Sequence, residues 1–115
     1  MDLYSILPVR SLAESRPWFE VFLGRPADEI IGEEYLWQVG ENAWLVVDDR
    51  PVRAPGVGRA MITLGVTDLD EILARLAAHG ITHEPVETYG NGVRHVVILD
   101  PDGNGLSLAQ SPGSG

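Results

Sequence analysis

The stretch VTDLDEILARLAAHG, residues 66–80, carries the signal that decides the fold. Its apolar residues recur at helical spacing and predict an amphipathic helix: Leu69, Ile72, Leu73 and Leu76. Asp68 occupies the position of a helix cap, and Gly80 is typical of a helix end. Residues 59–66 have the composition of a strand, so the chain turns here from a strand into a helix.

The same strand-to-helix corner occurs near the start of the chain. The sequence VRSL at residues 9–12 follows a predicted strand at residues 3–9. Ser11 and Glu14 form a capping box, in which both side chains satisfy free backbone N–H groups of the first helical turn. Gly24 is the expected end of this first helix.

The predicted first helix contains a proline at position 17. A proline inside a helix removes one hydrogen bond and clashes with the preceding turn. We therefore expect either a kink at Pro17 or a helix that begins later, with Ser15 as its cap.

Each predicted helix is followed by three short strands. In the first half these strands are expected at residues 28–31, 34–39 and 43–49. In the second half they are expected at residues 84–89, 93–99 and 105–109. The order strand, helix and three strands therefore occurs twice, which indicates an internal repeat.

A connection rich in proline and glycine separates the two halves. We predict a single domain over residues 1–115, of the α+β class, in which two βαβββ modules pair their curved mixed sheets and enclose a cleft. The parts of this domain are expected as follows: first module at about residues 3–50, linker at about 51–58, second module at about 59–110, and flexible tail at 111–115.

Charge and composition exclude several classes of function. The formal net charge is −9, and only eight Lys and Arg residues are present, which argues against a nucleic-acid partner. The chain has no cysteine, so disulfides, thiolate metal sites and cysteine nucleophiles are excluded. No segment approaches the roughly 18 apolar residues of a membrane span, and the N-terminus lacks a signal-peptide pattern. We therefore expect no membrane partner and a cytoplasmic location.

The sequence DPDGN at residues 100–104 leads into the last predicted strand and has the composition of a tight turn. Together with the two corners and with His79-Gly80-Ile81 after the second helix, it resembles the vicinal oxygen chelate superfamily. This superfamily includes glyoxalase I, extradiol dioxygenases, fosfomycin-resistance enzymes and bleomycin-resistance binding proteins. The resemblance covers residues 3–110, and it implies the fold more than the function, because the family hosts many chemistries on one scaffold.

In metal-dependent members of that family, the ligands stand at inward positions of the first and last strands of each module and are typically His, Gln or Glu. The resemblance places the following residues there: Tyr4, about Leu45, Met61 and Ser107. None of them is a suitable ligand for zinc, iron or manganese, and a one-residue shift in the first half offers no better donor. We therefore expect no metal, no cofactor and no catalytic residue of the family type.

Strand alternation assigns further side chains to the cleft. Tyr4 and Met61 face the cleft because the neighbouring residues face the helices. If Gly40 pairs with Ala43 across a turn, then Gln38 and Leu45 share the cleft face.

In that register Trp37 and Trp44 share the opposite face and pack in the core or in a dimer interface. A one-residue slip would instead bring both tryptophans into the cleft as stacking surfaces. The predicted ligand-binding residues are Tyr4, Gln38, Leu45, Met61, His95 and Ser107, with Trp37 and Trp44 as candidates for aromatic stacking.

Three functions from different classes fit these features. We favour a non-catalytic homodimer that resembles the drug-sequestering members and binds a small organic ligand, cationic or aromatic, because an acidic protein attracts cations. The second hypothesis is an enzyme of the lyase, isomerase or dioxygenase type that acts without metal through His95 or Tyr4, or with metal ligands at other positions. The third hypothesis is a regulatory or interaction module with a filled cleft.

Overall fold

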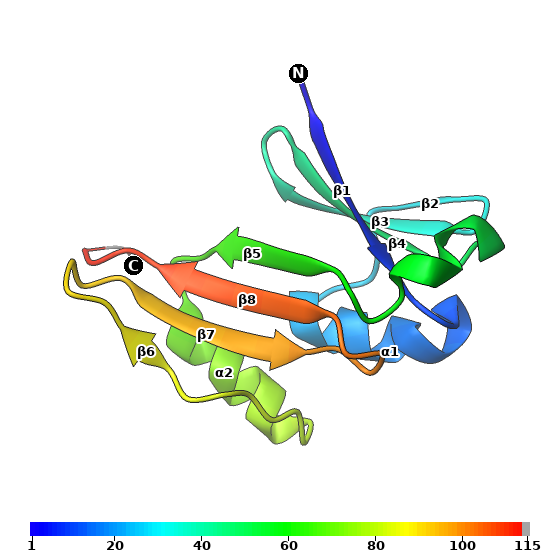
Figure 1. The fold of residues 1–115 in the computed structure, drawn as a ribbon. Helices are drawn as coiled ribbons and strands as arrows, with labels where there is room; N and C mark the ends of the chain where they lie inside the picture. Colours follow the sequence, from blue (N-terminus) through cyan, green and yellow to red (C-terminus); the bar gives the residue numbers. More distant parts are fainter. Residues whose placement is uncertain (114–115) are drawn as a thin grey trace.

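The computed structural model describes residues 1–113 and contains two modules with the same order of elements (Figure 1). The first module consists of β1 (Leu3–Pro8), α1 (Leu12–Leu23), β2 (Glu29–Ile31), β3 (Glu34–Gly40) and β4 (Ala43–Asp48). The second consists of β5 (Met61–Gly65), α2 (Leu69–Ala78), β6 (Glu87–Thr88), β7 (Arg94–Leu99) and β8 (Gly105–Gln110). A short 3-10 helix, η1 (Pro51–Gly56), joins the modules. Residues 114 and 115 of the predicted tail lie outside the described residues.

Each module forms its own four-stranded mixed sheet. Sheet A has the strand order β1-β4-β3-β2, and sheet B has the order β5-β8-β7-β6. In both sheets the first strand of the module pairs in parallel with the last, and the other pairs are antiparallel. The predicted α+β class with two βαβββ modules is therefore confirmed.

The first helix begins at the earlier of the two expected positions. The Ser11 hydroxyl accepts a hydrogen bond of 3.2 Å from the backbone N–H of Glu14. The helix continues through Pro17, which lies on its exposed side, and ends where Gly24 adopts a φ of 78°. The alternative start with Ser15 as the cap is wrong, because Ser15 is buried in the first turn of this helix.

The second helix differs from the prediction at its cap. Asp68 is the N-cap residue, but its side chain makes no capping hydrogen bond. The backbone N–H of Leu69 instead donates to Oε1 of Gln110, at 2.8 Å. A partner 41 residues away in the sequence is invisible to a local capping pattern.

The predicted strand at residues 84–89 is mostly irregular, and only Glu87 and Thr88 form β6. Pro85 explains the difference, because a proline has no N–H to donate to the strand ladder.

One hydrophobic core connects the two modules. Helix α1 lies beneath sheet A and α2 lies against one face of sheet B (Figure 1). The buried apolar side chains of both modules form one cluster that includes Leu7, Phe19, Trp37, Val47, Leu76, Ile98, Leu106 and Leu108. Among residues 1–113, no helix combines the length and the apolar character that crossing a membrane would require.

Candidate functional site

Each sheet has one face that points away from its helix, and we call these surfaces the open faces. In β1, Leu7 is buried in the core, whereas Tyr4 is 52% exposed on the opposite side. The alternation of side chains along each strand, together with the pairing register, then assigns the other strand residues to one face or the other. The open face of sheet A contains Tyr4, Ile6, Pro8, Glu29, Ile31, Glu34, Leu36, Gln38, Trp44, Val46 and Asp48. The open face of sheet B contains Met61, Thr63, Glu87, His95, Val97, Leu99 and Ser107.

Two aromatic rings form a shelf on the open face of sheet A. Tyr4 and Trp44 are register partners on the neighbouring strands β1 and β4. Their ring centroids are 6.2 Å apart and their planes differ by 11°, so the rings are stacked. The shelf is accessible to a ligand because about half of Tyr4 is exposed. We call this pair the Tyr4–Trp44 shelf.

A β-bulge decides which side chains reach this face. Gly40 pairs with Ala43, but the register shifts between Gln38 and Gly40, so Gln38 lies opposite Trp44. One extra residue reverses the facing of every residue beyond it, because side chains alternate with a period of two.

The bulge corrects the predicted facing of Leu45 and Trp44. Leu45 is 1% exposed and packs in the core, opposite Trp37. The prediction that Leu45 faces the cleft is therefore wrong. Trp44 lies on the open face, whereas Trp37 is fully buried and donates from Nε1 to the carbonyl of Arg25 at 3.0 Å. Of the two candidate stacking residues, only Trp44 is available to a ligand on the open face.

The open face of sheet B combines a sulfur side chain with a pair of hydroxyls. Met61 is 76% exposed. The hydroxyls of Thr63 and Ser107 are hydrogen-bonded to each other at 2.5 Å, across the parallel strands β5 and β8. Ser107 is buried, so its hydroxyl is engaged within the protein.

His95 lies on the same face of sheet B, one strand further out. Its ring stacks on Tyr89, with centroids 5.8 Å apart and an angle of 22° between the planes. Glu87 lies opposite His95 in the strand register. Tyr89 was not predicted as a site residue, because it follows a short edge strand and carries no local pattern that marks its orientation.

The predicted site residues therefore fall into two groups. Tyr4, Gln38 and Trp44 share the open face of sheet A, and Met61, His95 and Ser107 share the open face of sheet B. The two groups belong to separate sheets. Contact of these residues with a ligand stays a prediction.

The donor atoms do not fit the metal centre that the fold family implies. The strand registers make Ile6 the counterpart of Thr63, so the counterpart of Ser107 is Val46 rather than Leu45. The four equivalent positions are thus Tyr4, Val46, Met61 and Ser107. Within residues 1–113, no group of three or more His, Asp or Glu side chains is placed to hold a metal ion.

A buried carboxylate marks the far end of the open face of sheet A. Asp48 is fully buried and accepts hydrogen bonds from Arg50 at 2.8 Å and from Arg53 at 3.2 Å. Burial acts to raise the pKa of Asp48, but the hydrogen bonds from Arg50 and Arg53 outweigh it, so the pKa lies below its ordinary value. Arg50 also approaches Glu34 at 3.7 Å.

Comparison with known proteins gives a consistent result. The sequence model of the Glyoxalase/Bleomycin resistance protein/Dioxygenase superfamily matches residues 3–108. The crystal structure of a glyoxalase/bleomycin resistance protein from Catenulispora acidiphila DSM 44928 is 34% identical, with a TM-score of 0.84, and covers 97% of this chain and 99% of that chain. Among curated proteins, none matches this chain significantly.

Two more distant structures share the fold. The bleomycin resistance determinant encoded on the transposon Tn5 is 22% identical, with a TM-score of 0.77, over 95% of this chain and 96% of that chain. Lactoylglutathione lyase from Agrobacterium tumefaciens is 20% identical, with a TM-score of 0.75, over 96% of this chain and 92% of that chain. A resistance determinant and a lyase are thus both similar to this chain, so the fold alone does not select a function.

Proposed function

Because the chain belongs to the Glyoxalase/Bleomycin resistance protein/Dioxygenase superfamily, we propose that it is a small-molecule binding protein of the drug-sequestering kind. The observation that carries this proposal is the Tyr4–Trp44 shelf, in which two nearly parallel rings lie on an open face. Exposed aromatic rings offer a planar ligand a large apolar contact at little entropic cost. No step of the function passes through a metal, because the side chains at the equivalent positions do not fit one.

The charge of the protein favours a cationic ligand. The formal net charge is −9. Glu29 and Glu34 lie on the same open face as the shelf, and Glu87 lies on the other. A cation would be attracted by this field at long range and by the faces of the aromatic rings at short range.

The exposed apolar side chains of the open faces support a homodimer. Tyr4, Ile6 and Ile31 are exposed on sheet A, and Met61 and Leu99 are exposed on sheet B. In the proposed dimer, sheet A of one copy faces sheet B of the other, and the two faces together enclose the ligand. Contacts of this kind would bury apolar surface that otherwise remains in water.

Ligand binding is tested with two planar three-ring probes of opposite charge, proflavine and 9-anthracenecarboxylate. Isothermal titration calorimetry should show tighter binding of the cation. Trp44→Leu should weaken proflavine binding by about tenfold or more, which corresponds to about 1.4 kcal/mol of lost stacking. Tyr35→Leu is the matched control, because Tyr35 lies on the helix side of sheet A. Equal binding by the wild type and Trp44→Leu would contradict the proposal.

The dimer is tested separately by sedimentation velocity over a range of protein concentrations. Ile6→Glu and Met61→Glu place a charge on the open faces of sheets A and B, so each should shift the population towards monomer. Val52→Glu is the control, because Val52 is exposed on η1 and lies on neither open face. A wild type that stays monomeric at all concentrations would contradict the homodimer. The proposed ligand binding would still be decided by the calorimetric titration.

A further inference from the structure

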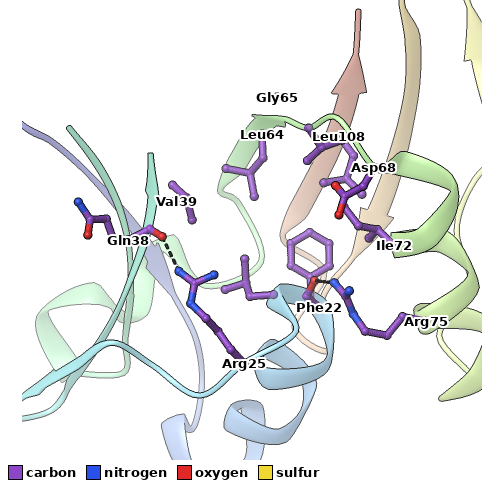
Figure 2. A pocket seen from close by; sticks show the side chains of 12 residues that line it. Phe22, Arg25, Gln38, Val39, Leu64, Gly65, Asp68, Ile72, Arg75 and Leu108 are labelled. Atoms are coloured by element: carbon purple, nitrogen blue, oxygen red, sulfur yellow. Dashed lines mark hydrogen bonds between the residues drawn. The ribbon is translucent and has the colours of Figure 1, made fainter. Parts of the chain in front are cut away.

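A pocket lies at the seam between the modules, on the helix side of the sheets rather than on the open faces (Figure 2). It has a volume of about 230 Å³ and is bounded by the end of α1, the end of β3, the end of β5 and the start of α2. Its apolar wall includes Phe22, Leu64, Ile72 and Leu108. Drug-sized ligands occupy roughly 300–1,000 Å³, so this pocket suits a smaller molecule.

The α2 side of the pocket carries a carboxylate with no partner, that of Asp68 (Figure 2). Asp68 lines the pocket, and its side chain is not used for capping, because Gln110 takes that role on Leu69. Among residues 1–113, no hydrogen bond or ion pair engages the Asp68 carboxylate. A helix-cap residue that does not cap is a departure from local rules of the kind that often marks a functional position.

The same α2 side of the pocket carries a guanidinium without a carboxylate partner, that of Arg75 (Figure 2). Arg75 donates from Nε to the carbonyl of Val21 and from Nη2 to the carbonyl of Phe22, both at 2.8 Å. Its Nη1 atom has no partner in the described part of the chain, and no described carboxylate lies within ion-pair distance of Arg75. Arg25, the second guanidinium of the pocket, differs because it pairs with Asp28 at 2.9 Å.

The two unpaired charges lie on one helix with a fixed spacing. Asp68 and Arg75 are separated by seven residues, or two helical turns, which is about 10 Å along the axis of α2. The backbone of an extended dipeptide spans about 7 Å, which is closer to this separation of the two positions than the two charges of a single amino acid, which share one carbon atom.

We propose that this seam pocket binds a short zwitterion with an apolar side chain, of the size and charge spacing of a dipeptide. The ammonium group lies at Asp68, the carboxylate lies at Nη1 of Arg75, and the apolar side chain packs on Phe22 and Leu64. Tyr4 and Trp44 do not line this pocket, although Gln38 of the same open face does. Because Phe22 comes from the first module and Asp68 from the second, the ligand would also hold the two modules together.

The test uses three probes with the same glycyl-leucine backbone and different terminal charges: glycyl-leucine, N-acetylglycyl-leucine, which lacks the positive charge, and glycyl-leucinamide, which lacks the negative charge. Each is titrated into the ¹⁵N-labelled full chain and followed by the backbone resonances of Gly24, Gly65 and Leu69. We expect glycyl-leucine to bind at least tenfold more tightly than either singly charged probe. Free leucine should bind more weakly than glycyl-leucine, because its charges are too close together.

Two variants locate the ammonium group. Asp68→Asn should weaken binding of glycyl-leucine at least tenfold and remove its advantage over the N-acetylated probe. Glu71→Gln is the matched control, because it removes the same charge one turn along α2, and Glu71 does not line the pocket. The melting temperature of each variant is measured first, so that loss of binding is compared only between folded proteins.

The proposal is overturned by any of three results: no saturable shifts with glycyl-leucine, equal affinity for the three probes, or equal affinity of Asp68→Asn and the wild type. Trp44→Leu should bind glycyl-leucine as the wild type does. If it does not, the peptide binds at the open face, and the seam pocket is not its site.

Discussion

Nδ2 of Asn104 donates a hydrogen bond of 2.9 Å to the backbone carbonyl of Pro8, 96 residues earlier in the chain. The same nitrogen donates to Asp100 at 2.8 Å, and Oδ1 of Asn104 accepts from the N–H of Ala60 at 3.0 Å. Asn104 is fully buried. The side chain of Asn104 therefore connects the turn between β7 and β8 by hydrogen bonds to the end of β1 in the other module and to the residue before β5.

Removal of this amide should destabilise the whole protein. Asn104→Ala leaves the half-buried Pro8 carbonyl and Ala60 N–H and the buried Asp100 carboxylate without this partner, so we expect the free energy of unfolding to fall by roughly 3 kcal/mol. The measurement is urea unfolding followed by circular dichroism. Asn91→Ala is the control, because Asn91 is exposed, and it should cost under about 1 kcal/mol. A similar loss in both variants would argue against the role of Asn104 between the modules.

Gly58 packs against that turn, and its replacement should destabilise the protein by a steric clash as well as by backbone strain. Gly103, which lies in the turn, has the backbone strain without the clash and serves as the comparison. Gly58 has a φ of 78°, and a Cβ atom there would lie 2.6 Å from the backbone oxygen of Asp102. Gly103 has a φ of 90°, but a Cβ atom there meets nothing within 4 Å. Gly103→Ala should cost about 1–2 kcal/mol from backbone strain alone, and Gly58→Ala should cost clearly more. Equal melting temperatures for the two variants would show that the turn shifts away from the added Cβ atom at position 58 without a loss of stability.

The buried Asp48 should make stability fall in acid. Its folded-state pKa lies below the ordinary value of 3.8, so the ionised form is favoured by folding. Its contribution to stability is fully present above the ordinary pKa and is lost as the pH falls through the folded pKa. Unfolding measured between about pH 2.5 and pH 6 should therefore show a shallower acid loss for Asp48→Asn than for the wild type. Glu29→Gln, which removes an exposed carboxylate from the same face, should leave the wild-type slope.

The sequence pattern places Leu45 and Gln38 on one face, whereas the bulge in β3 places them on opposite faces. Substitution by alanine should therefore be costly to stability at Leu45 and tolerated at Gln38. Leu45→Ala should lower the free energy of unfolding by about 2–5 kcal/mol, because Leu45 is buried in the core. Gln38→Ala should change it by less than about 1 kcal/mol, because Gln38 is exposed on the open face. Chemical denaturation of both variants decides the register. A tolerated Leu45→Ala together with a costly Gln38→Ala would contradict it.

Much of the fold could be predicted from local chemistry. The helical spacing at residues 69–76, the cap at Ser11 and the glycine stops each depend on neighbours within one or two turns. The repeated order of elements then indicated the α+β class and the family resemblance before any contact was known. The open facing of Tyr4 and Met61 also followed from alternation within single strands.

The incorrect predictions concern positions where the local structure depends on a residue far away in the sequence, on a proline, or on one extra residue in a strand. Gln110 replaces Asp68 as the cap of α2 from 41 residues away. Pro85 leaves only Glu87 and Thr88 in the strand predicted at residues 84–89. The bulge before Gly40 exchanges the faces of Trp44 and Leu45, because strand alternation has a period of two.

The sequence by itself determined the class of fold, the repeated module and the side chains at the family metal positions, because each of these follows from residue type and short spacing. Only the tertiary structure decided which tryptophan lies beside Tyr4, which charges remain unpaired at the seam, and how Asn104 joins the modules. These features depend on contacts between segments far apart in the chain, and their geometry is set by packing that no local pattern records.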